Sequence, residues 1–462
     1  MTQYPATERL SLKEKIGYGL GDMASNFYMG FFGLFLLYYY TDVWGISPAA
    51  AATMLLVTKI VDAISDPAMG LIADRTQSRW GKYRPYLLWV AIPYALLGYL
   101  LFMGPDLSEF GKLAFAYVSY TLVMLAYTAI NVPYSALLAV ISPVAEERTK
   151  ATQFRFVFAS LGTLTVGAMA KPLVNFFGGD DELLGFRLTI VLFAILSVLI
   201  FWITFATTKE RIQPKAHNSS VREDMAALLK NGSWIVLMFA GILIVVGLVA
   251  RFASLAFYTK YYLGHSDGTF FLWMDRTSFI VSCGLVGQLL GALVTPSLVK
   301  RGDKKTLMVG ANLLHAGLLF ACYFVSPDAY METVVLHTLG IFTFGVVITL
   351  LFAMYTDCAE YGEWKTGKNC AGLTVSASMF SLKFGSAVGG ALPGFILAWF
   401  GFVANQQQSD TSLMGIRLMS NALPALFFLG GGLLMVFYKI DRGTLRRMET
   451  ELADRRARNA SA

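Results

Sequence analysis

Two aspartates and a lysine stand close together in an otherwise apolar stretch. Lys59, Asp62 and Asp66 are three and four residues apart, so in an α-helix they would project within an arc of roughly 60°. Two carboxylates at that spacing repel each other, and a bound cation or a shared proton would relieve the repulsion. The pattern predicts a cation site, with Na+ as a candidate at Asp62 and Asp66, and Ser65 and Thr128 as neutral oxygen ligands. A static salt-bridge cluster that locks helices together is the alternative.

Other charged side chains also fall inside apolar stretches, where each costs about 2.5–3.5 kcal/mol at a helix centre. Asp22 lies in the first stretch. Arg251 is predicted to pair with a carboxylate or to contact the substrate, and both roles remain open. Lys383 also lies inside an apolar stretch and is predicted to join a functional charge network. Lys260 is expected to extend to the outer interface, whereas Lys171 remains ambiguous.

The composition excludes an ordinary soluble protein. The 462 residues are 56% hydrophobic and only 15% charged, with a mean hydropathy of +0.57, whereas soluble domains carry about 25% charged residues. The four cysteines show neither a disulfide pattern nor zinc-ligand spacing. The net charge of +7 comes from short loops between apolar runs, so nucleic acid is not an expected partner. We therefore expect an all-α protein of the lipid bilayer that needs no cofactor.

Apolar runs of about 20 residues, the length that crosses the hydrocarbon layer, predict twelve transmembrane helices. Helices are required because isolated strands cannot satisfy their backbone groups in lipid. The predicted spans cover residues 16–41, 48–73, 86–104, 112–141, 154–177, 187–208, 233–262, 272–299, 306–325, 332–356, 371–400 and 414–438.

The distribution of basic residues predicts the orientation. Twenty-eight of the 37 Lys and Arg residues lie in, or at the edges of, segments on the side of the N-terminus, and four lie in the opposite loops. Because Lys and Arg are retained on the cytoplasmic side, we expect both termini in the cytoplasm. The polar N-terminal arm shows no cleavage site, so no removable signal peptide is expected.

The sequence divides into two similar halves. We expect a six-helix bundle over 1–207, a cytoplasmic loop over 208–232, a second six-helix bundle over 233–440 and a cytoplasmic tail over 441–462. The basic segments GLIADRTQSRWGK (70–82) and TPSLVKRGDKKT (295–306) follow the second and eighth spans. Two six-helix halves with a substrate site between them are the design of the major facilitator fold.

Five segments carry a family resemblance. They are GYGLGDMASN (17–26), YYYTDVWG (38–45), DAISDPAMGLIADRTQSRWGKYRP (62–85), INVPYSAL (130–137) and TDCAEYGEWKTG (356–367). Together they resemble the glycoside-pentoside-hexuronide:cation symporters of the major facilitator superfamily. The resemblance implies an alternating-access carrier, working as a monomer in the cell inner membrane, that takes up a sugar with Na+, Li+ or H+.

The resemblance also implies site residues. The cation positions of the family match Asp62, Asp66, Ser65 and Thr128, and its basic residue one turn earlier matches Lys59. Its sugar-binding basic residues match Arg155 and Lys383.

The sugar site departs from the family pattern. Two sugar-binding aspartates fall at Asn26 and Asn131, and a stacking tryptophan falls at Ser135. Asp22, one helical turn before Asn26, is expected to replace the lost carboxylate. Further candidate sugar contacts are Tyr28, Tyr127 and Tyr134.

A cytoplasmic gate is expected where the second-half motif leaves the membrane. Its acidic residues would pair with the basic loop after the second span when the carrier is open to the outside, and such exposed pairs act only as a network. The predicted gate residues are Asp357, Glu360, Glu363, Arg75, Arg79 and Arg84.

Two functional alternatives follow from these charges. Lys59, Arg155 and Lys383 would favour an anionic sugar such as a hexuronide or a sulfonated sugar, unless the three aspartates neutralise them and leave a site for a neutral sugar. An exporter or a sensor with the same fold is a further alternative. A membrane enzyme is not expected, because no loop carries a catalytic constellation.

Overall fold

A computed structural model describes residues 9–211, 228–264, 269–366 and 371–461. Across these ranges the secondary structure is helical, apart from an isolated bridge between Phe271 and Met274. The chain forms two compact units. The first comprises Met1–Ala216, His265–Ser282 and Leu397–Gln408, and the second comprises His217–Gly264, Cys283–Ile396 and Ser409–Ala462.

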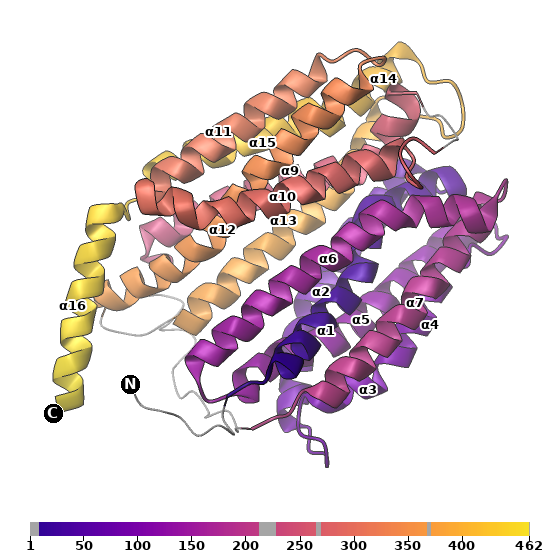
Figure 1. The fold of residues 1–462 in the computed structure, drawn as a ribbon. Helices are drawn as coiled ribbons and strands as arrows, with labels where there is room; N and C mark the ends of the chain where they lie inside the picture. The colour runs from indigo at the N-terminus through magenta and orange to yellow at the C-terminus, as the bar shows by residue number, and fades with distance from the viewer. Residues whose placement is uncertain (1–8, 212–227, 265–268, 367–370, 462) are drawn as a thin grey trace. The chain divides into compact units, whose positions relative to one another are not determined.

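The first unit contains the helices that carry most of the predicted site (Figure 1). Its first helix begins at a capping box, in which Ser11 and Glu14 bond each other's backbone N–H groups. The elements are α1 (Leu12–Phe31), the π-helical segments η2 (Phe32–Leu36) and η3 (Tyr39–Val43), α2 (Pro48–Arg75), α3 (Arg84–Trp89), α4 (Ala91–Leu101), α5 (Glu109–Ile141), α6 (Ala145–Gly178) and α7 (Glu182–Thr207).

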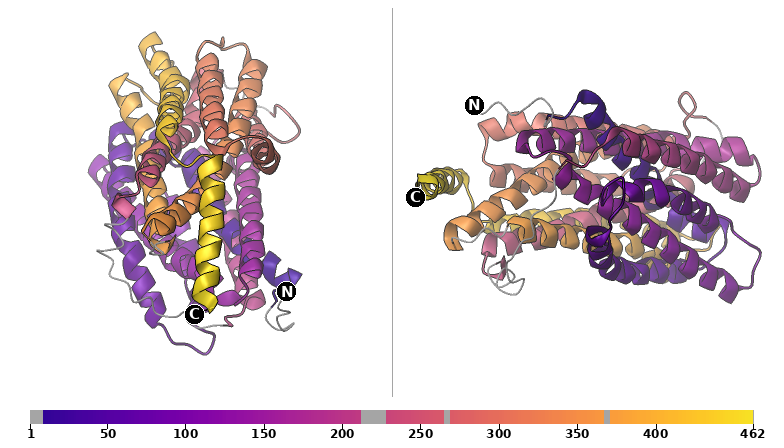
Figure 2. Two further views of the ribbon diagram at one scale, coloured as in Figure 1. Left: turned by 90° about the vertical axis from the view of Figure 1, so that its left-hand side faces the viewer. Right: turned by 90° about the horizontal axis from the view of Figure 1, so that it is seen from below.

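The second unit contains the remaining helices, except for the first residues of α10 and the last of α13. They are α9 (Gly232–Phe257), η4 (Tyr258–Tyr262), α10 (Arg276–Arg301), α11 (Lys304–Tyr323), α12 (Tyr330–Thr366), α13 (Ala371–Trp399), α14 (Asp410–Arg417), η5 (Leu418–Ala422), α15 (Leu423–Leu434), the 3₁₀ turn η6 (Met435–Phe437) and α16 (Arg442–Ser461). Figure 2 shows α16, in yellow, crossing the ends of the long helices of this unit rather than lying alongside them.

Among the described residues, nine helices are long and apolar enough to cross a membrane. They correspond to the fourth to twelfth predicted spans. The first three predicted spans are not among these nine, and the third of them is divided into α3 and α4. The division falls near Val90 because the ring of Pro93 meets the carbonyl four residues earlier, on Trp89. Twelve spans remain a prediction.

Three alternate glycines allow other helices to approach α1 closely. A Cβ atom on Gly17 would lie 1.9 Å from α7. One on Gly19 would lie 2.8 Å from the Phe154 carbonyl oxygen on α6, and one on Gly21 would lie 2.6 Å from the Tyr134 ring on α5. Because glycine has no Cβ, α1 lies against three neighbours at once. The GYGLGD segment therefore places α1 at the centre of the first unit.

The same kind of contact recurs in both halves. On α6, a Cβ on Gly162 would lie 2.9 Å from the Met23 carbonyl oxygen of α1. On α13, Cβ atoms on Gly385 and Gly389 would lie 2.9 and 2.6 Å from carbonyl oxygens of α9. The first and fifth predicted spans (α1 and α6) thus pack together through glycine, as do the seventh and eleventh (α9 and α13). The two halves of the chain therefore repeat the same helix contact.

This packing predicts a position-specific effect of alanine. Gly19→Ala should lower stability, since overpacking costs about 1–3 kcal/mol and a gain in helix propensity of about 1 kcal/mol offsets only part of that cost. Gly33→Ala is the matched control, because no atom lies within 4 Å of its added Cβ. Thermal unfolding of both variants in detergent measures the difference. Equal melting temperatures would contradict the close α1–α6 contact.

Candidate substrate and cation site

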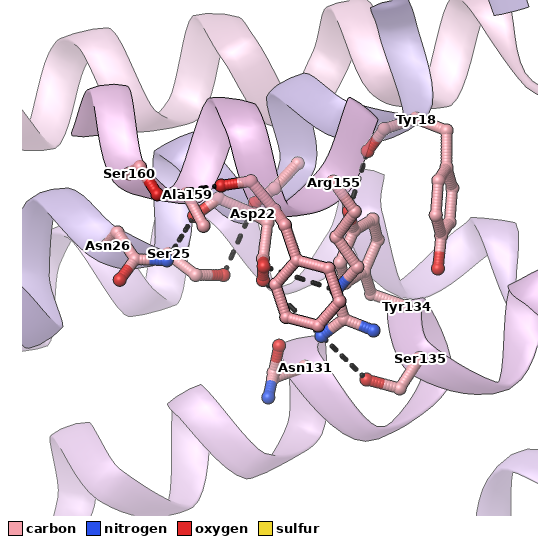
Figure 3. A network of polar contacts seen from close by, with 12 residues as sticks. Tyr18, Asp22, Ser25, Asn26, Asn131, Tyr134, Ser135, Arg155, Ala159 and Ser160 are labelled. Atoms are coloured by element: carbon pink, nitrogen blue, oxygen red, sulfur yellow. Dashed lines mark hydrogen bonds and ion pairs between the residues drawn. The ribbon is translucent and has the colours of Figure 1, made fainter. Parts of the chain in front are cut away.

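An ion pair between α1 and α6 forms the centre of the site (Figure 3). Arg155 Nε lies 3.1 Å from Asp22 Oδ2, and its Nη2 lies 3.4 Å from Oδ1. The same Nη2 donates to Ser135 Oγ at 3.3 Å, and the guanidinium lies 5.0 Å from the centre of the Tyr134 ring. Charge-assisted bonds of this kind are roughly twice as strong as neutral ones. Arg155 is therefore fixed by groups from two neighbouring helices.

Tyr134 is a support for Arg155 in this structure. Its hydroxyl donates to the Tyr18 carbonyl oxygen at 2.6 Å, and the two rings stack with centres 4.9 Å apart. The Tyr134 side chain is fully buried, and it fits against α1 because Gly21 has no side chain. The predicted sugar-stacking role remains a prediction, and the support from Tyr18 and the Ser135 hydroxyl was not foreseen.

The two asparagines at the predicted sugar positions differ in whether a side-chain hydrogen-bonding group is left without a partner in the described residues. Asn26 Nδ2 donates to the Asp22 carbonyl oxygen at 2.8 Å, and its Oδ1 accepts from Thr163 at 3.2 Å. Asn131 Nδ2 donates to the Tyr127 hydroxyl at 3.1 Å, but its buried Oδ1 has no hydrogen-bond partner among the described residues. Asn131 thus retains an acceptor, whereas Asn26 joins α1 to α6.

The predicted cation residues gather on α2 and α5. Lys59 Nζ lies 3.2 Å from Asp62 Oδ2, and the Thr128 hydroxyl donates to Asp66 Oδ1 at 3.0 Å. The Ser65 hydroxyl instead donates to the Asp62 backbone carbonyl at 3.2 Å. The other carboxylate oxygen of Asp62, Oδ1, is buried without a hydrogen-bond partner in the described part of the chain. Thr128 and Asp66 therefore contact each other across two helices, whereas Ser65 bonds the backbone of its own helix.

The described residues contain no group of three or more His, Cys, Asp or Glu side chains that could hold a metal ion. Any ion bound on α2 would have two carboxylates and hydroxyl oxygens as its protein ligands. Counted as ionised groups, Asp22, Asp62 and Asp66 outnumber Lys59 and Arg155 by one. These five side chains together thus carry one formal negative charge, which favours a cation.

The two basic residues of the second unit behave differently from each other. The Lys383 side chain is exposed on α13, and its predicted contact with sugar stays a prediction. Arg251 is 1% exposed and donates to the Ser420 carbonyl at 2.7 Å and to Asn421 Oδ1 at 2.9 Å, with His337 Nδ1 at 3.4 Å. Among the described residues, neutral groups of the π-helical segment η5 and His337 thus hold the Arg251 guanidinium. Both of its predicted roles stay predictions.

Three of the predicted gate residues have identified partners, and each partner lies in the same unit as the gate residue. Asp357 pairs with Lys304 at 2.7 Å. Arg84 donates to the Phe205 carbonyl oxygen at 2.7 Å, and the Arg79 guanidinium lies 4.2 Å from the centre of the adjacent tryptophan ring. The gate would have to join the two units, so it remains a prediction for these residues and for Arg75, Glu360 and Glu363.

The backbone of the loop after α2 binds a carboxylate from another part of the chain, a contact that the sequence did not predict. Glu210, just beyond α7, accepts the backbone N–H groups of Lys82, Tyr83 and Arg84 at 2.9, 2.8 and 2.9 Å. Gly81 has φ +109°, and a Cβ there would lie 2.4 Å from the Glu210 carboxylate. The positive φ explains why this loop contains glycine. Glu210 therefore ties the start of the central loop to the RWGKYRP segment.

Removing this tie should cost stability. Glu210→Gln weakens three charge-assisted bonds, so we expect the first unit to lose about 1–3 kcal/mol, and Gly81→Ala to lose at least as much. Glu109→Gln, exposed in the first turn of α5, is the control for loss of charge. Melting temperatures in detergent provide the measurement. A Glu210→Gln protein as stable as the control would show that these bonds contribute nothing.

A helical membrane carrier of the major facilitator type accounts for these features together, because long apolar helices enclose paired charges and repeat their packing in two halves. The sequence model of a family described as MFS/sugar transport protein matches residues 17–442. The inner membrane symporter YicJ of Escherichia coli is 34% identical over 98% of this chain and 97% of its own. The isoprimeverose transporter of Lactiplantibacillus pentosus is 34% identical over 95% and 92%.

The crystal structure of a D-xylose-proton symporter has the same fold, with a TM-score of 0.59, 15% identity, and coverage of 90% of this chain and 96% of that one. The chain therefore belongs to the MFS/sugar transport protein family. It is a multi-pass secondary transporter and not an enzyme. This confirms the predicted family and fold class.

Proposed function

We propose that the chain imports a neutral sugar or glycoside together with Na+ or H+ by alternating access. It acts as a monomer in the cell inner membrane with both termini in the cytoplasm. Relatives named as an inner membrane symporter and as an isoprimeverose transporter support cotransport and a sugar substrate. The distribution of Lys and Arg supports the orientation.

The observation that carries the proposal is the incomplete cation site on α2. A buried carboxylate oxygen without a hydrogen bond is costly, and Asp62 Oδ1 is in that position among the described residues. A bound Na+ or a proton would satisfy it. Asp66, four residues later, and the Thr128 hydroxyl that donates to it supply further oxygens on the same side.

The sugar site is supported by donors and acceptors that the protein itself leaves open. The Arg155 guanidinium has three nitrogens, and its hydrogen bonds to the described residues involve only Nε and Nη2. Nη1 can therefore donate to a sugar hydroxyl. The Oδ1 atom of Asn131, on the same helix as Ser135, is available as an acceptor. Because Asp22 already neutralises Arg155, an uncharged substrate fits this site.

Uptake into right-side-out vesicles tests the function. We expect a Na+ or proton gradient to drive accumulation of a neutral glycoside or pentoside. Asp62→Asn and Asp66→Asn should each lower that accumulation by about tenfold or more, because one charge of the cation site is lost. Sugar exchange without a gradient should survive in both variants.

Asp106→Asn, in an exposed loop, should transport like the unchanged protein. Accumulation against a gradient by either helix-α2 variant at the level of this control would refute the cation assignment. Transport seen only as efflux would instead identify an exporter.

A further inference from the structure

We propose that Asp22 sets the preference of this carrier for uncharged sugars. Its carboxylate binds the two Arg155 nitrogens that would otherwise bind the acidic group of a hexuronide or a sulfonated sugar. This inference rests on the proposed function, since it concerns the selectivity of the same sugar site. It assigns Asp22 a role in specificity in place of the direct sugar contact expected from the sequence.

The geometry of the pair matches recognition of an acidic group. The two oxygens of Asp22 face Nε and Nη2 of Arg155 at 3.1 and 3.4 Å, which is the two-point arrangement that arginine offers to carboxylates. A carboxylate supplied by a substrate would need the same two nitrogens. Asp22 is attached to the protein, so it competes at a high effective concentration. It also repels an approaching anion.

Arg155 is held in place independently of Asp22. Ser135 Oγ accepts from its Nη2 at 3.3 Å, and the fully buried Tyr134 ring lies 5.0 Å from the guanidinium. Both groups belong to α5, whereas Asp22 belongs to α1. Removing the Asp22 charge should therefore leave the guanidinium near its present position with the two-point site open.

The pair is also accessible enough for exchange with a ligand. The side chains of Arg155 and Asp22 retain 22% and 14% of their exposure. The Lys171–Glu182 pair in the same unit is a different ion pair, between α6 and α7, and its lysine and glutamate side chains are 10% and 32% exposed. Glu182 is thus the natural control for replacing a paired carboxylate by an amide.

The test compares competition by neutral and acidic sugars in exchange assays, which do not depend on cation coupling. In Asp22→Asn, the ratio of affinities should shift toward hexuronides or sulfonated sugars by about tenfold or more, the usual effect of gaining a charge-assisted bond. Glu182→Gln should leave the ratio unchanged. Adding Arg155→Gln to Asp22→Asn should abolish the gain.

If a variant no longer exchanges sugar, sugar binding to the purified protein is measured instead. Sugar-dependent shifts of the melting temperature are then measured for Asp22→Asn and for Asp22→Ser, which also lacks the charge. A shift of the ratio toward acidic sugars in either variant supports the proposal.

An unchanged ratio in both variants, with neutral sugars still bound, overturns it. So does the loss of neutral-sugar binding without any gain for acidic sugars, which would make Asp22 a direct sugar ligand. Failure of the unchanged protein to bind any neutral sugar would instead refute the proposed function, and the two failures are thus distinguishable.

Discussion

Every charge inside the apolar helices of this carrier needs a partner, because an isolated charge at the centre of a membrane helix costs several kcal/mol. The first unit meets this constraint with opposite charges: Asp22 pairs with Arg155, and Lys59 with Asp62. The second unit meets it with neutral groups around Arg251. Asp62 Oδ1 is a buried carboxylate oxygen whose pairing is incomplete among the described residues, and the proposed cation site is built on it.

Pairing across helices requires that the helices approach closely, and glycine makes that approach possible. Asp22 directly follows the GYGLG residues that allow α5, α6 and α7 to lie against α1. Without this packing, Arg155 of α6 could not reach both Asp22 of α1 and Ser135 of α5. The motif that looks like a helix-weakening run of glycines is thus what assembles the site.

Hydropathy predicted the later helices well, because long apolar runs leave few alternatives in lipid. Hydropathy did not predict two local features: the break between α3 and α4 before Pro93, and the continuation of α12 ten residues beyond the predicted end at residue 356. Intrahelical spacing correctly grouped Lys59 with Asp62. No spacing rule could pair Asp22 with Arg155, which are 133 residues apart, because that contact depends on how α1 packs against α6.

Contacts of the predicted cation residues and of the predicted sugar residues in the first unit lie on one helix. On α5, Thr128 bonds Asp66, and seven residues later Ser135 bonds Arg155. Between them lies Pro133, which has no N–H and leaves the carbonyl of residue 129 without its usual helical bond. Under the proposed function, a cation that rearranges Thr128 would therefore act on the same helix that positions the sugar site, and coupling could begin inside one unit.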